Sequence, residues 1–308
     1  MSLVVELRPL PVTRPWGGRR AAPRFGWADT RAIGEWWLAS CQPGHVSPLA
    51  QPGIAPDLAA FLAGPGRTQG LPAAADFPLL VKFLDCEQRL SLQVHPDDDC
   101  ARRQGLMRGK TEAWHVLAAE PGACVWLGTA PGVGAARLLD RVAAGADDEE
   151  ILALLRRIEV RAGDTLVVPA GSVHAIGPGL LLYEVQQNSD TTWRIHDWGR
   201  GRAVHLERAR QASLDHPPQP PTREPLRAGR WTSLLSTPAF GLRRALVDGA
   251  LDVAPEGPFA VLTALSGSGA LAADGQELAL RPGTTALVVG RARLTGTGLD
   301  VLCTDAPR

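Results

Sequence analysis

The chain has the length and composition of an ordinary globular protein: 308 residues, 45% of them hydrophobic, predict two domains or one large one. Its 32 basic residues balance its 32 acidic residues, so charge gives no reason to expect a nucleic acid or a membrane surface as a partner. The N-terminus lacks the pattern of a signal peptide, and no apolar run approaches the roughly 20 residues of a membrane helix. Five cysteines without a C-x-x-C pair are typical of free thiols, so we expect a cytoplasmic protein.

Short strands separated by turns dominate the expected structure. Apolar or alternating runs bounded by Pro, Gly and Asp predict strands at 77–85, 90–95, 112–119, 123–128, 164–171 and 180–188. Helical periodicity predicts short helices at 56–64, 135–145 and 147–158, the last with Asp147 as its N-cap. These helices are too short and scattered for a doubly wound α/β fold. We therefore expect a mainly β chain of antiparallel sandwiches or barrels with short helical insertions.

A proline-rich segment and an internal repeat predict the domain division. The stretch "LDHPPQPPTREPLRAGRW" (214–231) contains five prolines and predicts a linker or an extended surface strap. Residues 160–176 align with 280–296 at an offset of 120, which indicates one β-unit used twice. The second copy has Leu294 where the first has His174, so a site would belong to the first copy. We expect one domain over 1–213, a linker over 214–230 and a second domain over 231–308.

Polar residues alternate along two of the expected strands. In "SLQVH", Ser91, Gln93 and His95 share one face, because alternate side chains of a strand point the same way. By the same rule Lys110, Glu112 and Trp114 share a face in the next strand, whereas His115 faces away from Glu112. The inward faces of a small antiparallel barrel meet, so these residues are expected to approach one another.

A fourth polar residue follows a tight turn. In the string Gly163-x5-Pro169-x-Gly171-x2-His174, the histidine comes just after the Pro/Gly turn, where its ring reaches inward. Two imidazoles, a carboxylate and an amide oxygen suit a divalent ion, zinc first, with iron, manganese or cobalt as alternatives. The predicted donors are Gln93, His95, Glu112 and His174. Each histidine alone is more often a hydrogen-bonded strand residue, and it is the combination that favours a metal site.

Lysine is rare in this chain. Only Lys82 and Lys110 are lysines among the 32 basic residues, and the others are arginines. A lysine that remains in such a composition is expected to be needed as a compact, flexible ammonium, with chance survival as the alternative.

These motifs resemble a known family. The Gly-x5-Pro-x-Gly-x2-His string resembles the second cupin motif, and Gln93-Val94-His95 followed by Glu112 resembles the first, with glutamine in place of its first histidine. Together with "RPWGG", "IGEWW", "GKTEAWHVL" and "VPAGSVHAIGPGLLLYEVQQNSDTTWRIHDWGR", they resemble the type I phosphomannose isomerases in their short bacterial form. The resemblance covers residues 10–205, and the C-terminal part resembles only a degenerate cupin.

The resemblance implies a fold and a reaction. Its fold would be two cupin-type antiparallel β-barrel (jelly-roll) units, the first catalytic and metal-binding, the second metal-free. Its reaction would be the interconversion of mannose 6-phosphate and fructose 6-phosphate through an enediolate, with one Zn²⁺ or another divalent ion per chain. The substrate would be a phosphorylated hexose, and the enzyme a monomer or a homodimer in the cytoplasm. Gln93, His95, Glu112 and His174 would hold the metal, with Gln93 either a ligand or a neighbour of the ligands.

The resemblance also implies roles around the metal. Lys110 and Ser91 would contact the phosphate. Arg194 in "TTWRIHDWGR" would stabilise the enediolate with a permanent guanidinium, and a structural ion pair is its alternative. Glu184 in "LLYEVQQ" would be the acid/base group, with a role as partner of a ligand histidine as its alternative. The metal would either polarise the carbonyl or only orient hydroxyls, and the sequence leaves both open.

Two other function classes are compatible with a cupin site. A non-haem iron oxygenase also uses two histidines and a carboxylate, but the cations Lys110 and Arg194 suit a phosphate and an enediolate better. A non-catalytic sugar-binding cupin is the other alternative, and the complete set of ligands argues against it.

Overall fold

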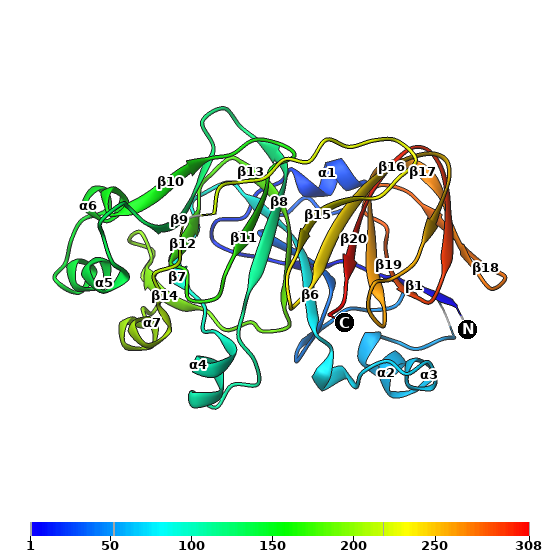
Figure 1. Ribbon diagram of the computed structural model, residues 1–308, viewed down its shortest axis with the longest axis horizontal. Coiled ribbons are helices and arrows are strands. Elements are labelled where there is room, and N and C mark those ends of the chain that lie inside the picture. The colour runs from blue at the N-terminus through cyan, green and yellow to red at the C-terminus, as the bar shows by residue number, and fades with distance from the viewer. Residues whose placement is uncertain (1, 52, 218, 308) are drawn as a thin grey trace. The chain divides into compact units, whose positions relative to one another are not determined.

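The computed structural model describes residues 2–51, 53–217 and 219–307, and most of its elements are labelled in Figure 1. The chain forms two compact units. The first unit consists of Met1–Thr13, Arg19–Phe83 and Arg223–Arg308, and the second of Arg14–Gly18 and Leu84–Thr222. As expected, the described residues are mainly β, in antiparallel sheets with short helices between the strands. The described sheets are open, so the closed barrels of a cupin stay a prediction.

The second unit holds the predicted site residues between two layers of strands. One layer is a five-stranded sheet in the order β10-β9-β12-β7-β14, and the other contains the neighbouring strands β11-β8-β13. The strands are β7 (Leu92–Val94), β8 (Glu112–Ala119), β9 (Cys124–Thr129), β10 (Leu155–Glu159), β11 (Thr165–Val168), β12 (His174–Ile176), β13 (Leu180–Gln187) and β14 (Trp193–His196). Their facing apolar side chains, among them Trp114, Val125 and Ile176, form one buried cluster. The site is therefore built beside a packed core.

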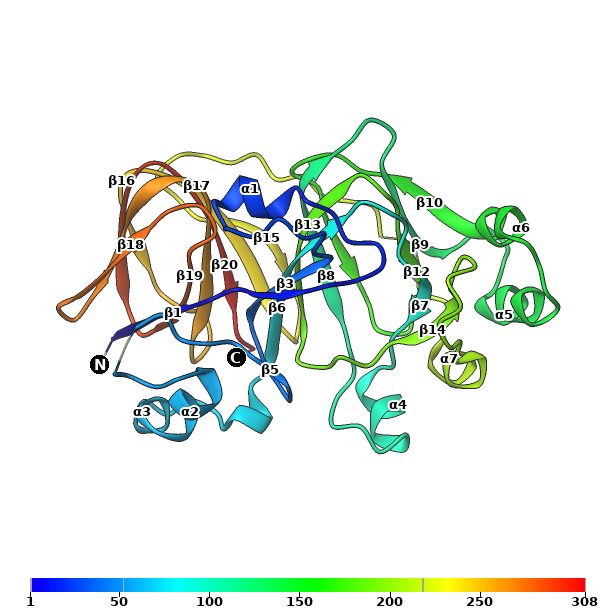
Figure 2. The ribbon, with the colours of Figure 1, turned by 180° about the vertical axis from the view of Figure 1, so that it is seen from behind.

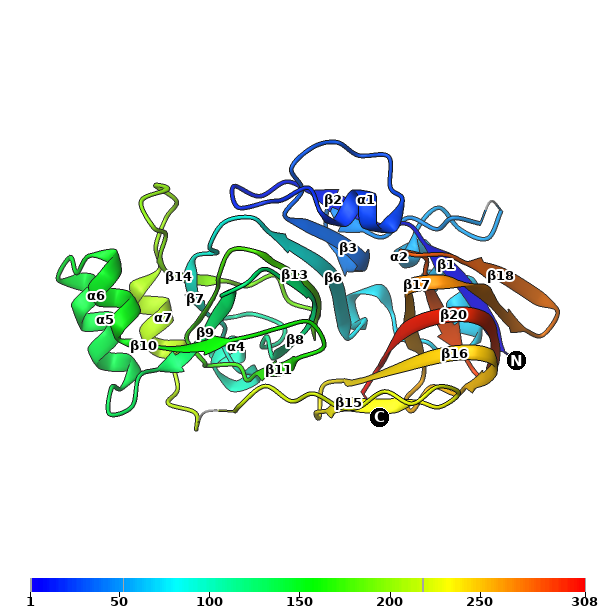
Figure 3. The same cartoon turned by 90° about the horizontal axis from the view of Figure 1, so that it is seen from above.

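Helices cover the other face of the five-stranded sheet. They are α4 (Asp98–Arg103), α5 (Ala135–Ala143), α6 (Asp148–Ala153) and α7 (Leu206–Ala212). Figure 3 shows α5, α6 and α7 side by side next to β14. Their buried residues Leu138, Ile151 and Ala209 pack against Leu92 and Ala175 of the sheet in a second apolar cluster.

The first unit is built on a larger sheet, in the order β1-β19-β17-β20-β16-β15 with β18 paired to β17. Figure 2 shows its long strands β16, β17 and β20. Its strands are β1 (Leu3–Leu7), β2 (Leu10–Val12), β3 (Glu35–Ala39), β4 (Cys41–Gln42), β5 (His45–Val46), β15 (Thr232–Ser236), β16 (Gly241–Val253), β17 (Ala260–Ala273), β18 (Gln276–Leu280), β19 (Thr285–Val289) and β20 (Ala292–Asp305). Its helices are α1 (Ala21–Phe25), α2 (Leu58–Ala63), α3 (Pro65–Thr68) and the 3₁₀ helix η1 (Ala74–Asp76). Strand β6 (Leu79–Cys86) continues along the chain from the first unit into the second.

The repeated segments form the same turn in both units. Gly163 and Gly283 have φ of 90° and 85°, and their N–H groups donate to Val116 O and Ala264 O, each at 2.8 Å. In both copies the strand after the turn pairs with a central strand, β11 with β8 and β19 with β17. The two segments are thus one β-unit used twice, as the alignment predicts. The division into domains at 213 and 231 concerns independent folding, which compactness does not test, and it stays a prediction.

Most of the expected elements are present, with one clear error. Asp147 caps α6 as predicted, accepting a hydrogen bond from Glu150 N at 2.9 Å. The helix predicted over 147–158 is wrong beyond Ala153, because Leu155–Glu159 forms β10 and pairs with β9. Pairing with a distant strand overrides the local helical period. The strands predicted at 90–95 and 164–171 are shorter in the structure, Leu92–Val94 and Thr165–Val168.

All five cysteines are free and buried. Of the helices that the structure describes, none is long and apolar enough to span a membrane.

A buried ion pair stabilises the sheet of the first unit. Arg243 Nε and Nη2 donate to the two oxygens of Asp305 at 2.7 and 2.9 Å, joining β16 to β20. Asp305 also accepts a hydrogen bond from Glu256 N at 3.0 Å. Arg293 and Asp252 form a comparable pair on the surface, at 2.7 Å, with side chains 60% and 68% exposed.

We expect Asp305→Ala to lower the free energy of unfolding by about 3–5 kcal/mol, because it leaves the Arg243 guanidinium buried without its carboxylate. The matched control Asp252→Ala should cost less than about 1 kcal/mol, because water screens an exposed pair. Urea unfolding followed by tryptophan fluorescence measures both variants. Equal shifts of the two midpoints would contradict this account of the pair.

Candidate metal centre

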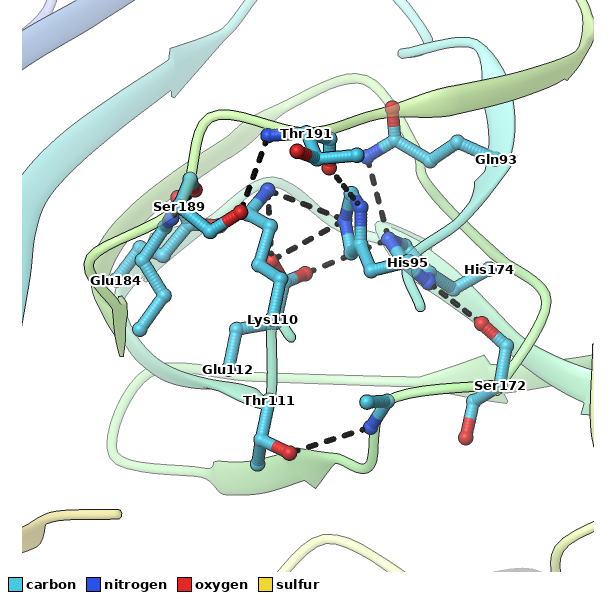
Figure 4. Close-up of polar contacts among 12 residues, drawn as sticks. Gln93, His95, Lys110, Thr111, Glu112, Ser172, His174, Glu184, Ser189 and Thr191 are labelled. Atoms are coloured by element: carbon cyan, nitrogen blue, oxygen red, sulfur yellow. Dashed lines mark hydrogen bonds and ion pairs between the residues drawn. The ribbon is translucent and has the colours of Figure 1, made fainter. Parts of the chain in front are cut away.

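His95, Glu112 and His174 meet between the two layers of the second unit (Figure 4). His95 follows β7, Glu112 opens β8, and His174 opens β12. One ligand atom from each residue lies within 4.8 Å of the others, and all three side chains are buried. His95 Nε2 is 3.4 Å from Glu112 Oε2, and His174 Nε2 is 3.4 Å from Glu112 Oε1. One carboxylate therefore faces both imidazoles, one oxygen toward each.

Backbone carbonyls orient the two rings. His95 Nδ1 lies 2.8 Å from Thr191 O, and His174 Nδ1 lies 2.9 Å from Ser172 O. Because a carbonyl oxygen only accepts, each Nδ1 carries the proton and donates. The Nε2 lone pairs are then directed toward Glu112, which is the tautomer that binds a metal through Nε2.

The protonation states also suit a metal. Burial, then the Lys110 ammonium, lowers the pKa of His95 to about 3, and burial likewise lowers the pKa of His174. Burial alone would raise the pKa of Glu112, but Lys110 and the two imidazoles outweigh it and hold that pKa well below its ordinary value. At neutral pH the cluster is thus two neutral imidazoles and one carboxylate, the ionisation that metal binding requires.

The residues fit a divalent ion. Both oxygens of Glu112 are buried and accept no hydrogen bond from any described residue. A buried carboxylate without hydrogen bonds is costly unless a cation balances it. Two nitrogens and one carboxylate oxygen, converging on one space, form the three-ligand set typical of zinc sites with an open position. Among the described residues, no other group of His, Cys, Asp or Glu converges in this way.

Gln93 and Ser91 line the same site. Gln93 pairs across the sheet with His174, and its amide Nε2 is 3.2 Å from His174 Nε2. Ser91 Oγ donates to Gln93 Oε1 at 3.3 Å. The two side chains therefore share a face, as strand alternation predicts.

Lys110 lies directly against the candidate ligands. Its Nζ is 3.2 Å from Glu112 Oε2 and 3.1 Å from His95 Nε2, and the side chain is buried. The predicted common face of Lys110 and Glu112 is thus confirmed. The ammonium provides positive charge beside the carboxylate in this arrangement.

Strand β8 separates its faces as predicted. The indole of Trp114 packs edge-on against His174, with ring centroids 5.5 Å apart. His115 instead contacts Thr165 of the neighbouring strand, its Nδ1 2.9 Å from Thr165 Oγ1. His115 therefore faces away from the metal ligands.

Glu184 and Arg194 lie on the strands β13 and β14, next to strands that carry or flank the ligands. Glu184 is buried on β13 and accepts a hydrogen bond from Trp114 Nε1 at 3.0 Å. Arg194 on β14 is the cross-strand partner of Gln93, which places the two side chains on one face of the sheet. Its Nη1 donates to Ala203 O at 2.8 Å, while its Nε is buried and makes no hydrogen bond. Asp197, 3.7 Å from that Nε, is engaged more closely by Arg202.

Sequence reasoning missed the groups that support the ligands. The carbonyls of Thr191 and Ser172 orient the imidazoles, and backbone groups leave no signal in a sequence. Gln186 was also missed: it is the cross-strand partner of Glu112, and its amide nitrogen donates to Ser189 O at 2.5 Å. Gln186 thereby holds the loop that presents Thr191 O.

Comparisons with known proteins identify the family of this chain. The family model for the catalytic domain of type I phosphomannose isomerase matches residues 16–116. The mannose-6-phosphate isomerase of Streptococcus mutans is 34% identical over 279 residues, 87% of this chain and 86% of that protein. The crystal structure of the mannose 6-phosphate isomerase of Bacillus subtilis matches with a TM-score of 0.81 at 25% identity, over 98% of this chain and 99% of that one.

A further solved structure, a zinc-bound mannose 6-phosphate isomerase, shares the fold with a TM-score of 0.79 at 18% identity, over 99% of this chain and 100% of that one. The expected family is therefore confirmed by three findings: the match of the catalytic-domain model, a relative aligned over most of both chains, and the fold. From its sequence and its fold, this chain belongs to the type I phosphomannose isomerase family.

Proposed function

We propose that the chain is a mannose-6-phosphate isomerase that interconverts mannose 6-phosphate and fructose 6-phosphate at a single metal centre. The observation that carries this proposal is the buried His95–Glu112–His174 cluster, in a chain that belongs to the isomerase family. Zinc is the proposed metal, supported by the ligand set and by the zinc-bound mannose 6-phosphate isomerase of the same fold. Family membership does not favour an iron oxygenase or a non-catalytic binding module.

The donor set of the metal has a proposed fourth member. Gln93 would add its amide oxygen to His95, Glu112 and His174, which is supported by the position of its amide beside His174 Nε2. When bound, the metal would supply a Lewis acid that polarises the carbonyl or orients the hydroxyls of the sugar. The protein holds the donors on two strand layers, so their arrangement is set before the substrate enters.

Proton transfer and charge stabilisation fall to two residues at the border of the site. The aldose becomes the ketose when one proton moves from C2 to C1 and a second moves from the oxygen on C2 to the oxygen on C1. We propose Glu184 as the group that carries the proton between the two carbons. The Trp114 indole N–H fixes the orientation of the Glu184 carboxylate. Arg194 would stabilise the enediolate, which is supported by its buried Nε without a hydrogen bond. Both roles remain proposals.

The phosphate is assigned to Lys110 and Ser91. In this arrangement Lys110 Nζ balances the charge of Glu112. A divalent ion and an ammonium repel strongly at about 3–4 Å in a buried site. Once Glu112 is balanced by a metal, the flexible Lys110 side chain is free to meet an anionic substrate. That Lys110 and Ser91 Oγ both sit beside the candidate ligands supports this assignment.

The proposal extends to the detailed fold, the cellular location and the oligomeric state. We propose that the domains over 1–213 and 231–308 are both cupin jelly rolls and that the second is a metal-free copy. The repeated turn supports this, as do the apolar residues Leu294 and Ala260 at the positions that correspond to His174 and Glu112. We also propose that the enzyme is cytoplasmic and acts as a monomer or a homodimer.

The first test is turnover. In a coupled assay with mannose 6-phosphate, the purified chain should form fructose 6-phosphate, lose activity with a chelator and regain it with zinc. His95→Ala, Glu112→Ala and His174→Ala should each lose bound metal and activity together, because each removes one of few ligands. His115→Gln, a change on the same strand but the opposite face, is the matched control and should keep both. If all three ligand variants retained stoichiometric zinc, the metal site would be elsewhere.

The second test is stoichiometry. Elemental analysis of the purified enzyme should give one metal ion per chain, since Leu294 and Ala260 offer no donor atoms in the second copy. His174→Ala should reduce this value to near zero. Two equivalents per chain, with one retained in His174→Ala, would contradict the metal-free assignment of 231–308.

The third test separates binding from chemistry. Lys110→Ala should raise KM more than it lowers kcat, because the phosphate is bound equally in the ground and transition states. Arg194→Ala should lower kcat by about 10²–10³, because the guanidinium acts where charge develops. Arg194→Lys should not restore the rate fully, since an ammonium lacks the planar fork. Steady-state kinetics decide the matter. An effect of Arg194→Ala on KM alone would make Arg194 a phosphate ligand instead.

A further inference from the structure

The start of the proline-rich segment is hydrogen-bonded to the turn that carries His174. Leu214 N donates to Gly171 O at 2.9 Å. His216 Nε2 lies 2.8 Å from Ala170 O and donates to it, because a carbonyl oxygen only accepts. Two consecutive carbonyls of the turn are thus held by one short segment, residues 214–216, which we name the clamp.

Gly171 links the clamp to both histidine ligands. Its N–H donates to the carbonyl of His95 at 2.7 Å, while its own carbonyl accepts from Leu214. Its φ is +89°, and a β carbon there would come within 2.8 Å of the Leu214 side chain. Only glycine fits this turn without strain. One residue later, Ser172 O accepts from His174 Nδ1 at 2.9 Å. A single turn therefore connects His95, His174 and the clamp.

The clamp is itself anchored. Asp215 Oδ1 accepts a hydrogen bond from Ala135 N at 2.8 Å, at the start of α5. Further along, Thr222 and Thr165 exchange two backbone hydrogen bonds of 2.8 and 2.9 Å. Thr165 opens β11, the strand that leads into the same turn. Hydrogen bonds therefore hold the chain at Asp215 and again at Thr222. A chain held at these points restricts the 169–172 turn, whereas a free linker would not.

We propose that residues 214–216 position the metal centre, with His216 and Leu214 holding the 169–172 turn so that His174 Nε2 faces Glu112. The inference rests on the proposed metal function. Metal ligands act well when the protein holds them within about 0.5 Å of the productive geometry before the ion arrives. Without the two hydrogen bonds from the clamp, the turn samples more conformations. Metal binding must then order the turn as well, which weakens affinity.

The test compares zinc affinities. Zinc-free protein is titrated with Zn²⁺ against a chromogenic chelator, in the full-length chain. His216→Ala should raise the zinc Kd by about 10-fold, the lower end of the effect of removing groups that orient metal ligands. His216→Gln keeps an N–H donor and should restore most of the affinity. Gln219→Ala, an exposed change in the proline-rich segment but outside the clamp, is the matched control and should leave the Kd unchanged.

Thermal unfolding of the zinc-free proteins separates positioning from a general loss of stability. A purely structural role would lower the Tm of zinc-free His216→Ala and leave its zinc Kd unchanged, and that result would overturn the inference. So would a Kd of His216→Gln as high as that of His216→Ala. If wild-type protein bound no zinc, the proposed function and this inference would both fall. If the wild-type protein bound zinc normally and His216→Ala bound it with the same Kd, only the inference about the clamp would be overturned.

Discussion

The buried carboxylate of Glu112 is the constraint on which the rest of the site depends. A carboxylate taken out of water is costly unless hydrogen bonds or a cation compensate it, and neither oxygen of Glu112 receives a hydrogen bond from the described residues. Lys110 provides one positive charge at 3.2 Å, and the two imidazoles are directed at the same oxygens by their Nε2 atoms. The group is thus built for a cation, and its low-dielectric surroundings strengthen whatever charge interaction forms there.

The two strand layers explain why the ligands are held so closely. Glu112 lies on one layer, while His95 and His174 belong to the other, and the apolar cluster around Trp114 fills the space beside them. Each ring is fixed by a carbonyl from a loop, Thr191 O for His95 and Ser172 O for His174. The ligands are therefore oriented by backbone that is itself tied down, by Gln186 on one side and by the clamp on the other. Such support makes a site precise without adding any further ligand.

The repeated β-unit shows what separates a site from a core on the same framework. The turns at Gly163 and Gly283 make equivalent hydrogen bonds, and the strand that follows each turn pairs with a central strand in the same register. In the first copy the interior positions hold Glu112 and His174. In the second, the corresponding Ala260 and Leu294 are buried in an apolar cluster. Charge in the second copy is instead neutralised in pairs such as Arg243 with Asp305, and among the described residues no second group of His, Cys, Asp or Glu converges there.

The sequence by itself determined the features that depend on local pattern. The alternation of side chains along a strand predicted β8 over Glu112–Ala119. It also predicted that Ser91 and Gln93 share a face and that His115 faces away from Glu112. Asp147 was recognisable as a cap because its side chain acts on a backbone group three residues away. Motif spacing predicted that His95, Glu112 and His174 lie close together. In the structure, one ligand atom from each residue lies within 4.8 Å of the others.

Tertiary structure alone decided what depends on distant partners. Residues 155–159 have a helical period, yet they form a strand because β9 offers hydrogen bonds to them. Lys110 could be placed on a face, but its contact with both Glu112 and His95 arises only when the two layers meet. The orienting carbonyls of Thr191 and Ser172 and the clamp over Gly171 act through backbone groups that every residue carries. Which of these backbone groups contacts a ligand depends on the folded path of the chain. The pattern of side chains in the sequence therefore could not predict these contacts.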